Sequence, residues 1–195
     1  MIDYTAALAR MINAARPLAA ESVPLLAALG RVSAESLKSP MQSPPFNNSA
    51  MDGFALKAEE TSSATLQQPL YFKIQDLIAA GHTGHYHGEK KAIKIMTGAQ
   101  VPPGYNTVLV IEEATIIDID HVPHLRVTTP LPRHQHIREA GEDIAQQDEL
   151  IAAGERFNAY QLMTLATVGL HTVSVKRTPT ICMMCTGDEI IDNDG

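Results

Sequence analysis

The sequence predicts a mixed α and β fold that is rich in β structure. Three observations predict it: an amphipathic pattern near the N-terminus, a long central stretch of short β-branched runs separated by Gly, Pro and Asn, and a short helical pattern near the C-terminus that leads into an apolar run. The chain has 195 residues, which is the top of the single-domain range and also enough for two small domains. Hydrophobic residues make up 45% of it, enough for a buried core.

The first forty residues are predicted to be helical. Asp3 or Thr5 can cap a first helix, and Pro17 marks its end. A second apolar pattern follows, in which Gly30 indicates a packing contact or an early stop. The two stripes, which we expect to pack in the core, are Leu8, Met11, Ile12 and Ala15, and then Leu26, Leu29, Val32 and Leu37.

Residues 40–137 are predicted to form a small, mainly β domain. The segment MQSPPFNNSAMDGFALKAEE opens it with loop and turn residues rather than a packed element. Four strand-like runs follow, with turn residues between them. They are PLYFKIQDLI (69–78), KKAIKIMTG (90–98), NTVLVIEEATIIDID (106–120) and HLRVTTPL (124–131).

The pattern changes again at residue 138. A charged, turn-rich segment leads to a short helix with Asn158 as its N-cap and Gly169 at its end. The run TPTICMMCTGDEII then predicts a fully buried strand that enters a Thr-Gly turn. Such a strand and turn often begin an α/β unit.

Charge and composition exclude several classes of protein. Lys and Arg number 15 against 22 Asp and Glu, a formal net charge of −7, which argues against binding to nucleic acid or to an anionic membrane surface. No apolar run approaches the ~20 residues of a membrane helix, and MIDYTAALAR is unlike a signal peptide. With two Cys there is no disulfide framework, so we expect a soluble, cytoplasmic protein with neither nucleic acid nor membrane as a partner.

Two glycine-containing loops of the central region carry candidate site residues. NNSAMDGF places the Asp52 carboxylate among small amide and hydroxyl side chains, where a few oxygens can bind Mg²⁺. The alternative is that Asp52 and Gly53 only form a turn. IMTGAQVPPG places Thr97 beside Gly98, where a hydroxyl and several N–H groups can face an oxyanion, although a β-turn uses the same residues.

Charged residues form two further motifs. In IREAGEDI, Arg138 can bind phosphate or carboxylate, and Glu142 and Asp143 can bind a metal; surface ion pairing is the alternative. Asp188 and Glu189 directly follow the predicted strand, and ligands of open α/β sheets bind at the carboxyl ends of strands. This last motif is the strongest single functional signal in the chain.

Two other clusters have simpler explanations. Cys182 and Cys185 have the spacing of a redox pair or of half a zinc site, but no second pair completes such a site. Residues three apart in a strand point to opposite faces, so two ordinary buried cysteines are expected, with a redox protein as the alternative. His82, His85 and His87 could bind a transition metal, but an exposed, solvated loop is expected.

Taken together, the motifs resemble one family. The sequence resembles the MoeA-type molybdopterin molybdenumtransferases of molybdenum cofactor synthesis. It has the motifs of that family in the same order and at comparable spacings, namely PPFNNSAMDGFAL, IMTGAQVPPG, IREAGEDI and TGDEI. ALGRVSAESL matches as well, so the resemblance spans essentially the whole chain. This family joins molybdate to the dithiolene of adenylylated molybdopterin, releases AMP, and uses Mg²⁺ or a similar divalent ion.

The resemblance implies roles for individual residues. Both substrates are anionic, so acidic residues make sense as ligands of a Mg²⁺ that bridges to phosphate, or as hydrogen-bond positioners. Arg138 and the Thr97 turn would meet oxyanions directly. The matching catalytic positions are Asp52, Thr97, Arg138, Asp143 and Glu189, with Asp188 in the same motif as Glu189, and the implied metal ligands are Asp52 and Glu189.

The resemblance also implies an architecture and partners. Members are elongated homodimers whose site is completed across subunits. Residues 1–39 and 138–172 would form an extended linker domain, helical with short strands; 40–137 would form a mainly β domain of coiled sheets, and 173–195 the first strand of a truncated α/β domain. The expected partners are adenylylated molybdopterin, molybdate and a second copy, and the molybdopterin adenylyltransferase is a further candidate.

The sequence departs from the family pattern in three ways. Phe54 replaces a common Tyr, and Cys185 stands where Ser is common. The chain also stops just after TGDEI, before the rest of the pterin-binding α/β domain. We therefore expect the 195 residues alone to be inactive, and a non-catalytic dimerisation or scaffold module built from the same domains is the alternative.

Overall fold

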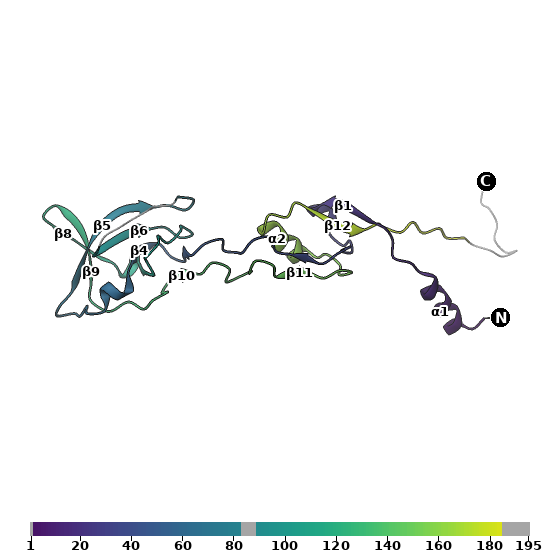
Figure 1. Cartoon of the computed structure of the whole chain (residues 1–195), viewed down its shortest axis with the longest axis horizontal. Helices are drawn as coiled ribbons and strands as arrows, with labels where there is room; N and C mark the ends of the chain where they lie inside the picture. The colour runs from purple at the N-terminus through teal and green to yellow at the C-terminus, as the bar shows by residue number, and fades with distance from the viewer. Residues whose placement is uncertain (1, 83–88, 185–195) are drawn as a thin grey trace, which may run out of the picture. The chain divides into compact units, whose positions relative to one another are not determined.

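The computed structural model describes residues 2–82 and 89–184 and shows a mostly β fold in which these residues form two α-helices. Contacts divide the chain into two compact units, and Figure 1 labels both α-helices and most of the strands. The central unit is Ser39–Asp148, and the terminal unit joins Met1–Lys38 to Glu149–Gly195. Residues 138–148 are thus grouped with the central unit. In the described ranges, no helix has the length and apolar character needed to cross a bilayer.

The central unit is built on a six-stranded sheet with the strand order β7-β4-β6-β5-β9-β8. Neighbouring strands are antiparallel except for β5 and β6, which are parallel. The four predicted strand-like runs are confirmed, and the third holds two strands with a 3₁₀-helix, η3 (Ile111–Glu113), between them. The strands are β4 (Gly53–Leu56), β5 (Leu70–Ile78), β6 (Lys91–Ile95), β7 (Thr107–Val110), β8 (Thr115–Ile119) and β9 (Val122–Val127), and a 3₁₀-helix, η2 (Ala58–Thr61), follows β4.

This sheet is buried on both faces where β4, β6 and β7 meet. Side chains alternate between faces along a strand, so Phe54 and Leu56 enter one apolar cluster while Ala55 enters the other. β4 and β7 are buried at every position, and apart from Thr107 at the start of β7 their sequences do not alternate between polar and apolar. The prediction that the segment before the first strand-like run is only loop and turn is therefore wrong at β4. The two clusters fix the strand ends that carry the site residues.

Gly53 opens β4 because no larger residue fits there. A Cβ atom at this position would lie 2.1 Å from the carbonyl oxygen of Leu109 on β7, far inside van der Waals contact. The close approach of the two backbones therefore requires glycine directly after Asp52.

Short strand pairs organise the terminal unit. β1 (Ala20–Pro24) pairs antiparallel with β12 (Thr172–Lys176), and residues 32–34 pair along the other edge of β12. β2 (Leu37–Lys38) pairs antiparallel with β11 (Glu149–Ile151). The core of this unit consists of Leu25, Ala28, Ile151, Phe157, Leu162, Leu165, Val173 and Val175.

Both α-helices begin at predicted caps. α1 (Tyr4–Ala14) follows Asp3, whose side chain accepts a backbone N–H hydrogen bond at 3.0 Å. α2 (Ala159–Thr167) follows Asn158, which forms a reciprocal capping box with Gln161. Each cap satisfies N–H groups that have no partner in the first turn, so a local signal locates both starts.

The prediction that the first helix packs in the core is wrong. No residue of α1 is buried, and Met11 and Ile12 are each 64% exposed. The amphipathic stripe is present as predicted, but the described part of the chain does not cover it.

The second predicted helix does not form. In its place the chain makes a single turn of 3₁₀-helix, η1 (Leu25–Ala28), and Gly30 follows with φ of +75°. This left-handed conformation breaks the helical path, and the residues after it extend along β12. Leu25 and Ala28 are buried, whereas Leu26 and Leu29 remain exposed.

The prediction of a fully buried strand at TPTICMMC is wrong for the residues that the structure describes. Residues 178–184 have no strand assignment, and Met183 is 91% exposed. A buried strand needs hydrogen-bonded neighbours and covering side chains on both faces, and the described chain supplies neither here. β12 ends at Lys176, before this segment begins.

Candidate functional site

The NNSAMDG segment forms a backbone link between two loops of the central unit. On one side, β3 (Asn48–Ser49) pairs antiparallel with β10 (Ile137–Arg138). On the other side, the Gly98 N–H donates to the Ser49 carbonyl at 2.8 Å, and the Ser49 N–H donates to the Ala99 carbonyl at 3.0 Å. The loop of Thr97 and the loop of Arg138 are therefore fixed to the same short strand.

Asp52 and Thr97 are brought together as a hydrogen-bonded pair. Asp52 Oδ1 accepts from the Thr97 backbone N–H at 2.7 Å and from its hydroxyl at 2.8 Å. The pairing of β4 with β6 causes this contact, because Asp52 directly precedes β4 and Thr97 follows the end of β6. The two hydrogen bonds, helped by the charge of Lys94, lower the pKa of Asp52, so this carboxylate is an anion at neutral pH.

The second oxygen of Asp52, Oδ2, accepts no hydrogen bond from the residues that the structure describes. Mg²⁺ is commonly bound through one or two carboxylates, with water and phosphate oxygens completing its shell. An oriented, ionised carboxylate with one open oxygen fits that requirement. The described ranges contain no cluster of three or more His, Cys, Asp or Glu placed to hold a metal, so Asp52 would act as a single protein ligand among them.

The N–H groups of the Thr97 turn are used inside the protein. Thr97 N–H donates to Asp52, Gly98 N–H to Ser49, and Ala99 N–H to the Met96 carbonyl at 3.0 Å. In this arrangement the turn orients the Asp52 carboxylate rather than presenting three amides to a bound oxyanion.

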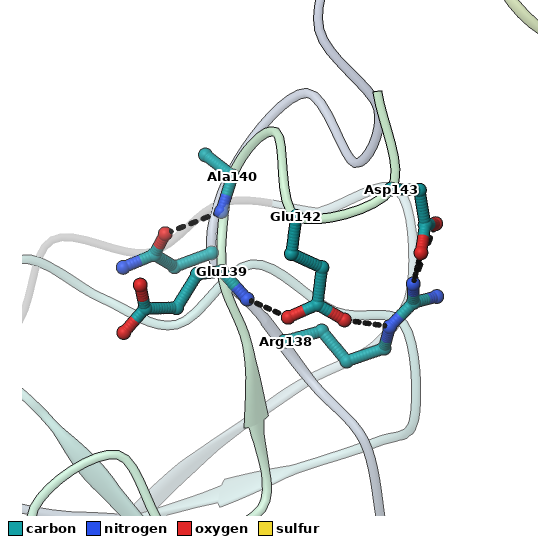
Figure 2. Close-up of polar contacts among 6 residues, drawn as sticks. Arg138, Glu139, Ala140, Glu142 and Asp143 are labelled. Carbon is teal, nitrogen blue, oxygen red and sulfur yellow. Dashed lines mark hydrogen bonds and ion pairs between the residues drawn. The ribbon is translucent and has the colours of Figure 1, made fainter. Parts of the chain in front are cut away.

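Arg138 is held between two carboxylates (Figure 2). Its Nε donates to Glu142 Oε1 at 2.6 Å, and its Nη2 donates to both oxygens of Asp143 at 2.6 and 2.5 Å. The other oxygen of Glu142 accepts from the Glu139 N–H at 2.8 Å. The bond from Arg138 lowers the pKa of Glu142, and the bonds to Glu142 and Asp143 raise the pKa of Arg138.

The charges of this second group sum to −1. Arg138 contributes +1, and Glu142 and Asp143 contribute −1 each. All three side chains are partly exposed, Glu142 and Arg138 somewhat less than Asp143. The arginine therefore orients Asp143, and the group as a whole attracts a cation more than an anion.

Sequence reasoning missed two residues that hold the arrangement. Asn47 Oδ1 accepts from Ala140 N–H at 2.8 Å, and the Asn47 carbonyl accepts from Val101 N–H at 2.9 Å, so one residue ties both loops. His134 Nδ1 lies 2.6 Å from Glu139 Oε1. Asparagine in a turn-rich segment was a usable signal for Asn47, whereas the partner of His134 depends on the fold.

Several predicted residues are not tested by this geometry. Asp188, Glu189, Cys185, His85 and His87 lie outside the described residues. His82 is exposed, as predicted. Cys182 is exposed rather than buried, because the strand that would have buried it is not formed in the described segment.

Comparison with known proteins identifies the family. The model of the MoeA N-terminal region (domain I and II) matches residues 2–169. The chain belongs to this MoeA family. The match includes the segments that carry Asp52, Thr97, Arg138 and Asp143, so the resemblance seen in the motifs is confirmed.

Relatives and solved structures agree with the MoeA assignment. The chain is 31% identical over 195 residues to a molybdopterin molybdenumtransferase of Synechococcus elongatus, covering 98% of this chain and 47% of that protein. It is 35% identical over 189 residues to molybdopterin molybdenumtransferase 2 of Mycobacterium tuberculosis, covering 96% and 45%. A molybdopterin biosynthesis MoeA protein from Pyrococcus horikoshii superposes with a TM-score of 0.81 at 28% identity, covering 92% of this chain and 45% of that one. The chain thus spans about half the length of these MoeA proteins.

Proposed function

We propose that the chain is the N-terminal part of a molybdopterin molybdenumtransferase, which inserts molybdenum from molybdate into adenylylated molybdopterin. Membership of the MoeA family and the names of the relatives support this proposal. The observation that carries it at the level of chemistry is the Asp52 carboxylate, ionised and oriented by Thr97 with one oxygen open.

In this proposal Asp52 is a ligand of Mg²⁺. The ion, when bound, would supply positive charge that offsets the phosphate charges of the nucleotide substrate. Thr97 holds the carboxylate in place through two donors, so little reorganisation is needed when a cation approaches. Glu189 is the second proposed metal ligand and Asp188 a further catalytic residue, both from the motif after the described residues.

Arg138 and Asp143 are proposed as a positioning pair. Because the guanidinium already binds Glu142 and Asp143, its role is to fix the Asp143 carboxylate. A carboxylate held in this way can orient a substrate hydrogen-bond donor or a metal-bound water, which contributes positioning rather than covalent chemistry.

The proposed partners are a second copy of the chain, the two substrates and, as a further candidate, the molybdopterin adenylyltransferase. Exposed apolar side chains on the terminal unit support self-association. An apolar pocket of about 360 Å³ opens there, and Leu26 and Met163 in its lining are exposed. The low cysteine content favours the reducing cytoplasm as the place of action.

We propose that the 195 residues alone do not complete the reaction, because they correspond to about half of each relative. The competing proposal is a non-catalytic dimerisation or scaffold module. The exposed apolar surface suits both proposals, whereas a metal-binding Asp52 suits only the enzyme.

Manganese binding discriminates between the two. Mn²⁺ is a paramagnetic substitute for Mg²⁺, and its binding broadens the NMR signals of nearby backbone amides. We expect low concentrations of Mn²⁺ to broaden residues around Asp52 and Thr97 selectively in the 195-residue chain, and excess Mg²⁺ to restore those signals.

The matched variants are Asp52→Asn and Asp120→Asn. Asp120 is an exposed aspartate of the same unit, and its φ of +52° is one that asparagine tolerates. Asp52→Asn should abolish the selective broadening and Asp120→Asn should leave it unchanged. Equal broadening in wild type and Asp52→Asn would favour the scaffold module.

A further inference from the structure

A small pocket with basic residues in its lining lies in the terminal unit, apart from the residues of the candidate site. It has a volume of about 190 Å³ and forms where the segment after η1 meets the end of β12. This is below the range of about 300–1,000 Å³ that drug-sized ligands occupy, so it suits a small group. Its lining is Gly30, Arg31 and Val32 from one segment and residues 176–179 from the other.

Three of the seven residues that line this pocket are basic. Arg31, Lys176 and Arg177 contribute three positive charges, and the carboxylate of Glu21 contacts the two arginines. Their sum is +2, in a chain whose formal net charge is −7. A local positive region on an acidic protein marks a place where an anion is favoured.

Hydrogen bonds fix the pocket before any ligand arrives. Arg31 Nη2 donates to Glu21 Oε1 at 2.5 Å and to the Lys176 carbonyl at 2.8 Å. The Lys176 N–H donates to the Val32 carbonyl at 2.8 Å, which joins the two walls. Arg31 therefore acts as a brace between the walls, and its charge is shared with Glu21.

The other two cations are available. Lys176 is partly buried, and its ammonium group has no ion pair or hydrogen bond within residues 2–82 and 89–184. Arg177 Nε is 3.9 Å from Glu21 Oε2, at the limit of an ion pair, and its side chain is 64% exposed. A partly desolvated lysine without a carboxylate partner gains more from an anion than a solvated one does.

We propose that this pocket binds a phosphate group, either free inorganic phosphate or the phosphate of a monoester such as a nucleotide. Lys176 and Arg177 supply the charge, Arg31 supplies the rigid wall, and the Thr178 hydroxyl is a further donor in the lining. The inference does not depend on the metal site proposed at Asp52, since all of its residues belong to the terminal unit.

The test uses the purified 195-residue chain and backbone amide NMR at constant ionic strength. Inorganic phosphate and AMP are titrated separately, with chloride replacing them in the reference series. The double variant is Lys176→Gln with Arg177→Gln. The matched control is Arg10→Gln with Lys38→Gln, two exposed cations of the same unit that change the net charge equally.

We expect phosphate to cause saturable chemical-shift changes in the amides of residues 30–32 and 176–178. The dissociation constant for phosphate should be about tenfold higher in the double variant than in wild type. In the control variant it should lie within about twofold of the wild-type value. If AMP and inorganic phosphate bind with equal affinity, the pocket recognises the phosphoryl group alone. If AMP binds more tightly than inorganic phosphate, the pocket recognises the phosphate of a nucleotide. Both results support the proposal. If the double variant unfolds, Arg177→Gln alone should weaken binding by about threefold. Shifts that do not saturate, or equal weakening in the control, would overturn it.

Discussion

At the scale of single residues, the site depends on how a carboxylate is stabilised as an anion. Two donors from Thr97 stabilise ionised Asp52, so its folded-state pKa is lowered. This contributes stability that is fully present above the unfolded-state pKa near ~3.9 and is lost as pH falls through the folded-state pKa. The residue is therefore fully charged at any pH at which the protein would act.

Removing the Thr97 hydroxyl should raise the pKa of Asp52. Thr97→Val keeps the β-branched shape and the backbone donor, but it loses one of the two donors to Oδ1. A pH titration of side-chain carboxyl NMR signals measures the shift, and Thr97→Ser should keep the wild-type value. An unchanged Asp52 pKa in Thr97→Val would contradict the role given to the hydroxyl.

Replacing Gly53 should destabilise the central unit. Gly53→Ala puts a Cβ at the Leu109 carbonyl, which costs about 3 kcal/mol of unfolding free energy or more, as overpacking does. Gly98→Ala is the comparison, because a Cβ atom at that position meets no other atom. This substitution should lower the free energy of unfolding only by the ~1–2 kcal/mol that a left-handed φ costs. Urea unfolding measures both, and equal losses would show that the backbones of β4 and β7 can separate.

At the scale of elements, helices and strands that depend on local sequence signals could be predicted, whereas those that depend on long-range contacts could not. Strands β5 to β9 and the caps of α1 and α2 could be predicted, since β-branched runs, turn residues and Asn or Asp caps act within a few residues. Strand β4 could not, because the Pro, Gly and Asn residues just before it indicate a loop, and its burial depends on pairing with β6 and β7. The absence of a helix around Gly30 could not be predicted from local signals. The residues that follow Gly30 pair instead with β12, which comes about 140 residues later in the sequence. Propensity was overridden by that tertiary contact.

The two helix caps should differ in their effect on stability. Asn158→Ala should lower the free energy of unfolding by about 1 kcal/mol, because α2 packs into the core of the terminal unit. Asp3→Ala should reduce helix content by circular dichroism but barely change unfolding, because no residue of α1 is buried. An Asp3→Ala loss as large as that of Asn158→Ala would show that the apolar face of α1 is covered in solution.

At the scale of the whole molecule, the two units carry different features. The central unit gathers Asp52, Thr97, Arg138 and Asp143 around β3, and the terminal unit carries the exposed apolar surface and the basic pocket. Motifs in the sequence predicted these four residues as candidates, and the structure brings them together in two pairs. The motifs could not predict that Asn47 joins the two loops, because that contact spans some 90 residues of sequence. The ion pairs of Arg138, in contrast, are local contacts made four and five residues along the chain, and the motif itself offers them as an alternative to ligand binding.

The net negative charge of the chain also affects how an anionic ligand could bind to it. If the proposed substrates bind, the formal charge of −7 would repel them, and the proposed metal at Asp52 or the proposed anion pocket would supply the local attraction. Each proposal assigns that attraction to its own set of residues, so substitutions at one site test that proposal without affecting the other.

The most direct test of the central claim is cofactor formation by a chimera. This chain replaces the matching segment of the Synechococcus elongatus relative, of which it covers 47%, and the product formed from adenylylated molybdopterin, molybdate and Mg²⁺ is measured. We predict that the chimera forms molybdenum cofactor, that Asp52→Asn lowers the rate by about 100-fold or more, and that Asp120→Asn has no effect. A folded chimera that forms no cofactor, or an Asp52→Asn chimera as fast as Asp120→Asn, would contradict the account.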